Sequence, residues 1–427
     1  MARLFIGIFL IICIQPDLLG QKMPRTPNRT DANGMKQGAW TILYDSAWQI
    51  IENKKAAIFY RQITYSDNLP TGVVKDYCRN GNVQWEGMLL ADQPEDIIDG
   101  TCFYYRPDGS LQFEAVYDNG NALGQLEYEN NLPKVSSWND VYAFGDVYWN
   151  REQFEEAARC YQMALPIAQK EEGQESGYAT LLNDIALCEV RNNHFDAALK
   201  NYEIALSIKE RVEGVESDSY LKTAENMGFV PYKQGDLHWN EKEYRTALKY
   251  YFKAQKIFEE YGATSNPIYA NLINDIGVCL DKEKEYDSAI TYINKALALK
   301  TNLFSVDDKE YKSTLYNLGL FLSNKSRVLA EKQKYDSSIL LQRHALKAIL
   351  PLHGKYHSTY SEITNSIGVD YFNIQQPDSA EYYYRESLAI RDSLYGKQGY
   401  DYAYVLRNIA LLYLNEFKYQ QAISLYE

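Results

Sequence analysis

Three stretches of eight residues decide the fold: LLNDIALC at 181–188, LINDIGVC at 272–279 and ITNSIGVD at 363–370. Each stretch begins 91 residues after the previous one. Their apolar residues recur three or four positions apart, which places them on one face of a helix. Nearly the same segment written three times at one interval indicates an internal repeat, in which each unit buries its apolar face against the next.

A second recurring segment predicts that each repeat is a pair of helices. FEEAARCYQMAL at 154–165 has the spacing of one helix face, and related segments begin at 195, 244, 286, 335, 377 and 419. One small residue marks each copy: Ala157, Ala198, Ala247, Ala289, Ser338, Ala380 and Ala422. Another stands twelve positions earlier in most copies: Gly145, Ala186, Gly277, Gly368 and Ala410. An aromatic residue follows four positions later in most copies: Tyr161, Tyr202, Tyr251, Tyr384 and Tyr426. Paired small residues let two helices approach closely, and the aromatic ring fills the space beside them.

This pattern resembles the tetratricopeptide repeat over residues 138–427, and its 42-residue spacing is similar to the longer variant found in kinesin light chains. The resemblance implies a right-handed helical solenoid of about seven hairpins, the last one incomplete. It also implies that the first helix of each hairpin lines a concave groove that holds peptides.

The 91-residue interval combines one repeat of 42 residues with one lengthened repeat of 49. The lengthened copies contain NMG at 226–228 and NLG at 317–319, and this Gly precedes the later small residue by 19 positions instead of 12. Seven extra residues make about two helical turns. We expect them to be divided between the two helices of the hairpin, adding about one turn to each.

The amino-terminal third carries a different repeat, with the alternation of strands. GVVKDYCRNGNVQWE at 72–86 and GTCFYYRPDGSLQFE at 100–114 match at a distance of 28 residues. Asn-Gly and Asp-Gly between alternating residues predict hairpin turns. This stretch resembles MORN-like repeats over about residues 34–130, which implies a binding or spacer module, and ADQPEDIID at 91–99 is typical of an inserted acidic loop. The predicted fold class is therefore mainly α: a helical solenoid preceded by a small antiparallel β-repeat sheet.

The first twenty residues predict export. Arg3 precedes an apolar run from Leu4 to Ile14, and Pro16 and Gly20 follow, as in a secretory signal peptide. No later segment approaches the 18 apolar residues of a membrane span, so we expect a periplasmic or extracellular protein that does not cross a membrane. The net charge of −13 argues against a nucleic-acid partner, because binding phosphates requires a basic face.

Neither a metal site nor a catalytic site is predicted. Five cysteines follow the signal segment, none in a CxxC pair: Cys78, Cys102, Cys160, Cys188 and Cys279. We expect buried apolar residues, with a Cys160–Cys188 disulfide left open because the two fall on neighbouring predicted helices. His353 and His357 are expected on a loop between repeats and not as metal ligands. No catalytic triad, phosphate-binding loop or dinucleotide motif is present, which predicts a non-enzyme without a cofactor.

The candidate binding residues are asparagines on the first helix of the repeats: Asn183, Asn226, Asn274, Asn317, Asn365 and Asn408. An amide both donates and accepts, so it can hold a peptide backbone without reading its sequence, and the resemblance implies that use. Caps or local packing explain the same residues equally well. Asp184 and Asp275 beside them predict a partly acidic groove that favours a basic or neutral ligand.

Three functions remain open on the sequence alone. The first is an exported scaffold that binds a protein or peptide partner, similar to bacterial exported tetratricopeptide proteins. The second is the recognition region of a longer protein, because such arrays resemble those that precede CHAT-type peptidases or membrane signalling domains. The chain ends within a predicted second helix, which we expect to leave Ile423 and Leu425 half exposed. The third is a structural spacer. The sequence specifies neither the ligand nor the oligomeric state.

Overall fold

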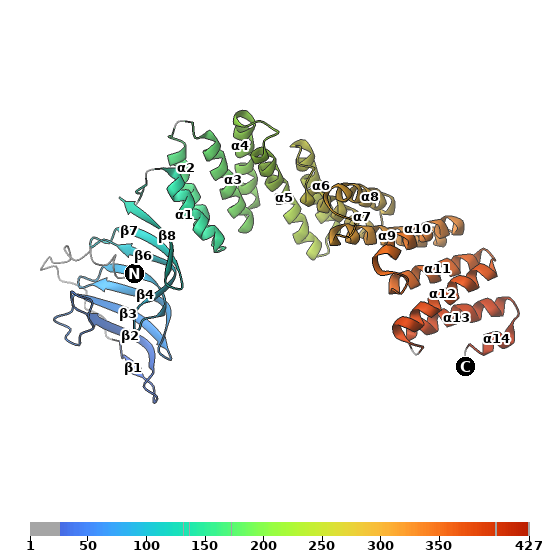
Figure 1. Ribbon diagram of the computed structural model, residues 1–427, viewed down its shortest axis with the longest axis horizontal. Helices are drawn as coiled ribbons and strands as arrows, with labels where there is room; N and C mark the ends of the chain where they lie inside the picture. The colour runs from blue at the N-terminus through green and yellow to red at the C-terminus, as the bar shows by residue number, and fades with distance from the viewer. Residues whose placement is uncertain (1–25, 131, 136, 172, 398, 426–427) are drawn as a thin grey trace. The chain divides into compact units, whose positions relative to one another are not determined.

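A computed structural model describes residues 26–130, 132–135, 137–171, 173–397 and 399–425. The expected signal peptide lies outside the described residues. The predicted fold class is confirmed: an antiparallel sheet is followed by a helical solenoid (Figure 1).

Nine described strands form one sheet, and each strand pairs with its neighbour in the chain. Short turns connect most of them, with longer loops between β2 and β3 and between β5 and β6. Gly81 and Gly109 occupy the predicted turn positions with φ of 91° and 89°, where a residue with a side chain is disfavoured. The strands are β1 (Arg29–Thr30), β2 (Lys36–Tyr44), β3 (Phe59–Ser66), β4 (Leu69–Cys78), β5 (Val83–Ala91), β6 (Ile97–Tyr105), β7 (Leu111–Asp118), β8 (Asn121–Glu129) and β9 (Leu132–Pro133).

The acidic loop between β5 and β6 contributes to the core of the sheet. The loop is shorter than expected, because β6 already begins at Ile97. Arg61 is buried on β3, where its guanidinium donates to Asp76 at 2.7 Å and to Asp96 of the loop at 2.8 Å. Asp92 accepts a hydrogen bond from Tyr65. The loop carboxylates therefore satisfy polar groups on the apolar face of the sheet.

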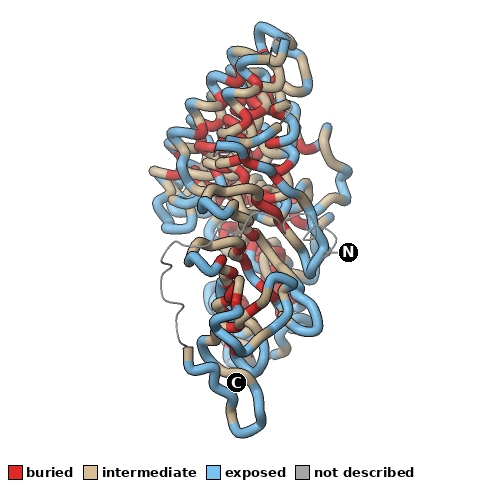
Figure 2. The backbone as a smooth tube through the Cα atoms, turned by 90° about the vertical axis from the view of Figure 1, so that its left-hand side faces the viewer, coloured by how far each residue is buried: buried red, intermediate tan, exposed pale blue. Residues whose placement is uncertain are grey.

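Fourteen described helices follow, in antiparallel pairs. They are α1 (Trp138–Asn150), α2 (Phe154–Ala168), α3 (Glu175–Arg191), α4 (Phe195–Val212), α5 (Asp218–Asn240), α6 (Tyr244–Glu260), α7 (Pro267–Lys282), α8 (Tyr286–Leu303), α9 (Lys309–Glu331), α10 (Tyr335–His353), α11 (Ser358–Asn373), α12 (Pro377–Tyr395), α13 (Tyr400–Asn415) and α14 (Tyr419–Ile423). Figure 2 shows the buried residues concentrated where helices pack together. The chain divides into two compact units, Met1–Val212 and Glu213–Glu427.

Small residues of the first helix make room for a tyrosine of the second helix, as the pattern predicted. A Cβ atom added to Gly145 would lie 2.6 Å from the ring of Tyr161, and one added to Gly368 would lie 2.6 Å from the ring of Tyr384. Only glycine fits such an approach without movement of the ring.

The expected division of the seven extra residues is wrong, because they lengthen only the first helix. Helices α5 and α9 have 23 residues each, against 16 in α7, whereas their partners α6 and α10 have 17 and 19. Gly235 and Ser326 stand twelve positions before Ala247 and Ser338, so the turn of the hairpin keeps its ordinary geometry. The extension therefore lies at the amino-terminal end of the first helix.

A buried basic residue recurs with the 91-residue interval, at Lys209, Lys300 and Arg391. Lys300 Nζ donates to the carbonyl oxygen of Glu310 at 3.3 Å and to its carboxylate at 3.1 Å. Arg391 donates to the carbonyl oxygen of Asp401. Within the second unit, the cation near the end of α8 thus bonds to the start of α9, and the one near the end of α12 bonds to the start of α13.

The five described cysteines are buried, and Cys160 and Cys188 are free thiols, so the disulfide between them that the sequence left open is not formed. Burial raises the pKa of the Cys160 and Cys188 thiols to about 12. At the carboxyl end, Ile423 is 48% exposed. Among the described residues, no helix is sufficiently long and apolar to cross a membrane.

Candidate functional site

The six candidate asparagines lie on α3, α5, α7, α9, α11 and α13, the first helices of their hairpins. None has an exposed side chain, and Asn183 and Asn365 are buried. The others are half-buried. The asparagines therefore lie at the surface between consecutive first helices rather than on fully solvated positions.

Within the second unit, asparagines 43 residues apart bond to each other. Asn317 on α9 donates to Asn274 Oδ1 on α7 at 3.2 Å. Asn408 on α13 donates to Asn365 Oδ1 on α11 at 3.0 Å. Part of the amide chemistry is thus used for packing between repeats. The Oδ1 atoms of Asn317 and Asn408 accept no hydrogen bond from another described residue, so each pair keeps an acceptor for a ligand.

Asp184 in the first unit and Asp275 in the second unit have equivalent partners, each within its own unit. Tyr142 donates to Asp184 at 2.8 Å, and Tyr232 donates to Asp275 at 2.5 Å. Asn274 also donates to Asp275, at 2.9 Å. Burial raises the pKa of both carboxyl groups despite these donors. Each carboxyl group is therefore shielded behind its tyrosine and asparagine, and contributes less charge to this face than the sequence suggests.

Sequence reasoning missed the residues that complete this face. Asn324 on α9 donates to both carboxylate oxygens of Asp281 on α7, at 2.9 and 3.0 Å. Tyr316 on α9 lies 3.0 Å from Thr359 on α11, between hydroxyl oxygens. Both contacts join residues 43 apart. A search of the sequence for complementary donors and acceptors 43 residues apart could have found them.

The buried tyrosines of the second helices give a matched pair of predictions. Tyr251 donates to Asp236 at 2.8 Å, whereas the buried Tyr202 hydroxyl has no partner among the described residues. Tyr251→Phe should lower the unfolding free energy by about 1 kcal/mol, the typical value of a lost hydrogen bond. Tyr202→Phe should leave it unchanged or raise it, because a buried unsatisfied hydroxyl is removed. Urea unfolding of the two variants measures both; equal losses would contradict the assignment.

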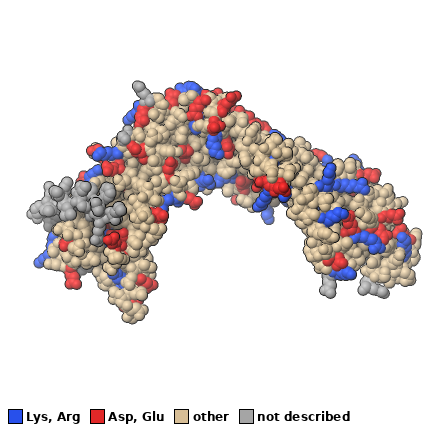
Figure 3. All heavy atoms as spheres, in the orientation of Figure 1, with Lys and Arg blue, Asp and Glu red and all other residues tan. Residues whose placement is uncertain are grey.

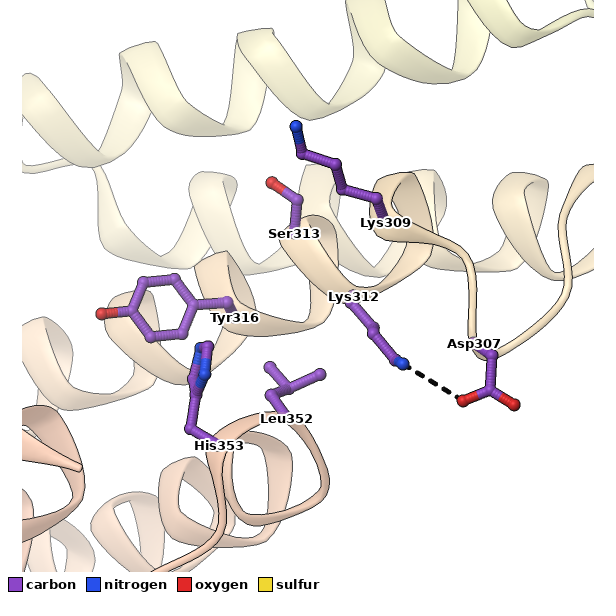
Figure 4. A pocket seen from close by; sticks show the side chains of 7 residues that line it. All are labelled: Asp307, Lys309, Lys312, Ser313, Tyr316, Leu352 and His353. Atoms are coloured by element: carbon purple, nitrogen blue, oxygen red, sulfur yellow. Dashed lines mark hydrogen bonds and ion pairs between the residues drawn. The ribbon is translucent and has the colours of Figure 1, made fainter. Parts of the chain in front are cut away.

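A pocket of about 340 Å³ lies between the start of α9 and the end of α10 (Figure 4). Lys312 forms an ion pair with Asp307 at 3.1 Å on its rim, and the His353 ring points toward Tyr316. His353 is the last residue of α10 and stacks on His357, with ring centres 4.4 Å apart. Both histidines were expected on a loop between repeats, which is wrong for His353 because α10 extends to it. His357 lies on the loop, where its Nδ1 caps α11 by accepting from the Thr359 amide at 3.2 Å.

One described cluster has metal-ligand chemistry. His238 lies in the last turn of α5, and Glu241 and Glu243 lie between α5 and α6, with ligand atoms of the three within 4.8 Å of one another. His238 Nδ1 lies 2.9 Å from Glu243 Oε2, so two of the three groups already contact each other. On the face shown in Figure 3, acidic and basic side chains are interspersed.

Solved structures of helical-repeat proteins are similar to this chain. BtubC from P. vanneervenii is 18% identical, with a TM-score of 0.32, covering 58% of this chain and 93% of its own. TPR-like repeats of a putative kinesin light chain from Podosopora anserina are 10% identical, with a TM-score of 0.29, covering 52% and 98%. The C-terminal part of a TPR repeat-containing protein from Cytophaga hutchinsonii is 14% identical, with a TM-score of 0.37, covering 60% and 84%.

A curated relative, the Secreted RxLR effector protein RXLR-C07 of Plasmopara halstedii, is 26% identical over 125 residues, or 28% of this chain. The chain spans about a third of the length of that relative, 35%. The tetratricopeptide repeat model matches residues 139–211, 224–302 and 359–427, which together make up just over half of the chain. With the small-residue hairpins described above, this match shows that the chain belongs to the tetratricopeptide repeat family.

Proposed function

We propose that the helical array is a non-catalytic scaffold that binds an extended segment of a protein or peptide partner along its first helices. Tetratricopeptide repeats are typical protein–protein interaction modules. The observation that carries the proposal is the state of the asparagine pairs. Each pair is held in place by one hydrogen bond, and the Oδ1 of Asn317 or Asn408 remains available to accept a backbone N–H. A side chain fixed before binding loses little entropy when the ligand arrives.

The chemistry of this face favours a partner read through its backbone. Amide groups bond to any peptide, so they supply affinity with little sequence preference. The nearby carboxyl groups of Asp275 and Asp281 accept their hydrogen bonds from within the array and offer no donor to an acidic side chain. A neutral or basic segment therefore suits this face better than an acidic one.

The test uses a partner captured with the full chain, identified, and then measured as a purified protein by calorimetry. The double variant Asn317→Ala with Asn408→Ala should weaken binding by about tenfold or more, since two hydrogen bonds are lost. Asn294→Ala is the control, because Asn294 is an exposed asparagine on the second helix α8. Thermal melts of all variants separate lost binding from lost folding. Unchanged affinity in the double variant would overturn the proposal and favour the structural spacer.

We further propose that the chain is exported, which rests on the signal-like residues 1–20. In the same reading, the MORN-like residues 34–130 act as a second binding surface or spacer. Fractionation of cells that make the natural protein, with amino-terminal sequencing of the product, tests export. A product that retains Met1 and stays in the cytoplasm would contradict it.

The alternative function is that of a recognition region within a longer protein, which would also carry a CHAT-type peptidase or a membrane signalling domain. The intact mass of the natural product tests this alternative. A mass that corresponds to processed residues 21–427 would exclude it.

A further inference from the structure

Three buried polar residues form a cluster where α10 packs against α11. Ser338 is 0% exposed, Gln342 2% and Asp370 2%. Gln342 Nε2 donates to Asp370 Oδ2 at 3.1 Å and to Ser338 Oγ at 3.2 Å. The Gln342 Oε1 atom is buried without a hydrogen-bond partner among the described residues. The Gln342 amide therefore uses its donor group and leaves its acceptor oxygen without a partner.

Among the described residues, no lysine, arginine or histidine forms an ion pair with Asp370. The groups that act on its carboxyl are Ser338 and Gln342 from α10 and, from α12, Tyr384. A buried carboxylate without a cation is costly, because the charge has left water and gained little in return.

The other cassettes place apolar or aromatic residues at the same positions. Asp370 is the last letter of ITNSIGVD, and its counterparts 91 and 182 residues earlier are Cys279 and Cys188, both buried. Gln342 stands 91 residues after Tyr251, and Ser338 stands 91 residues after Ala247. The packing surface between α10 and α11 thus carries polar and titratable groups where the equivalent surfaces of the array carry apolar or aromatic ones.

We propose that Asp370 and Gln342 form a pH-sensitive joint between hairpin α9–α10 and helix α11, closed when Asp370 is protonated and loosened when it is ionised. The protonated carboxyl is neutral, so it can stay buried while Gln342 Nε2 donates to its Oδ2 at 3.1 Å. Ionisation removes the O–H and leaves a buried negative charge, which opening of the joint returns to water.

The pH range over which the joint responds follows from the pKa of the Asp370 carboxyl group. Burial raises the pKa of Asp370 from 3.8 to about 6. A folded-state pKa above the unfolded value means that stability is present at low pH and falls as pH rises through about 6. The equilibrium constant for closing the joint should fall about tenfold between pH 5.0 and 7.5.

Hydrogen exchange of the full chain, followed by mass spectrometry at pH 5.0 and 7.5 and corrected for intrinsic rates, tests the joint. Peptides from α10 and α11 should be about tenfold better protected at pH 5.0 in the wild type. Asp370→Asn and Asp370→Cys should abolish this difference while protection stays high. The transplant Cys279→Asp should create the same pH dependence in α6 and α7.

Two results would overturn the joint. One is an equal pH dependence of α10 and α11 in wild type and Asp370→Cys, which would assign the effect to other groups. The other is equal protection at both pH values in the wild type. Asp370→Asn retains the volume and the hydrogen-bonding capacity of the side chain, so it keeps the test valid if Asp370→Cys folds poorly.

Discussion

Replacing Arg159 with alanine should lower the free energy of unfolding of the amino-terminal unit by about 3 kcal/mol. Glu114 on β7 is only 1% exposed, and it accepts hydrogen bonds from Tyr128 on β8 at 2.9 Å, from Tyr148 on α1 and from Arg159 on α2. Loss of the guanidinium leaves a buried carboxylate without a cation, which costs more than the ion pair itself contributes. The sheet and the first helical hairpin should therefore lose their common anchor.

The measurement is urea unfolding followed by tryptophan fluorescence, since Trp138 and Trp149 lie on α1. Arg159→Lys should recover part of the loss, because the charge remains while the fork of donors is lost. Arg151→Ala is the control, since its ion pair with Asp118 is long, 3.9 Å, and exposed, and should cost below about 1 kcal/mol. Equal effects of Arg159→Ala and Arg151→Ala would show that Glu114 does not depend on its cation.

Gly235→Ala should destabilise the second unit by about 2–3 kcal/mol through overpacking. A Cβ atom at this position would lie 2.3 Å from Cε1 of the Tyr251 ring. The ring cannot move aside freely, because the Tyr251 hydroxyl is bonded to Asp236. The clash must therefore separate the helices α5 and α6 or break that hydrogen bond.

Gly277→Ala is the matched control at the equivalent position of α7. There a Cβ atom would meet the Ala289 carbonyl oxygen at 3.3 Å and Phe321 at 3.5 Å, a contact that small shifts relieve. Alanine already occupies this position as Ala186 and Ala410. Thermal unfolding should place Gly277→Ala within about 1 kcal/mol of the wild type. If Gly235→Ala unfolded at the same temperature as Gly277→Ala, the close approach of α5 and α6 would not limit stability.

The sequence predicted the hairpins because their determinants are local. A small residue, its partner twelve positions away and a following aromatic can all be read from one repeat. The length of α5 could not be predicted with the same pattern, because seven residues fit either helix of a hairpin. In the structure Gly235 is the small residue of the hairpin, twelve positions before Ala247. From the sequence alone, Gly228 also meets the requirement for a small residue.

Residues that act across the modules were beyond sequence reasoning for a physical reason. Glu114 alternates with Phe113 and Ala115 on β7, as a solvent-facing residue of a single sheet does. It is buried only because α1 and α2 cover that face, and no local pattern records this packing. The asparagine pairs are similar: their residue type and helix were predicted, whereas the bond from Asn408 to Asn365 depends on how consecutive repeats stack.

The 91-residue interval makes the array a set of interchangeable modules. The buried cations Lys209, Lys300 and Arg391 share this interval, as do the long helices α5 and α9. Deleting 91 consecutive residues inside the array would rejoin equivalent positions in register, so the helix lengths and the spacing of the small residues are kept. Deleting 42 residues would join a long first helix to a surface shaped for a short one. Gain and loss of whole cassettes is thus the route by which such a chain can change its length with its hairpin geometry unchanged.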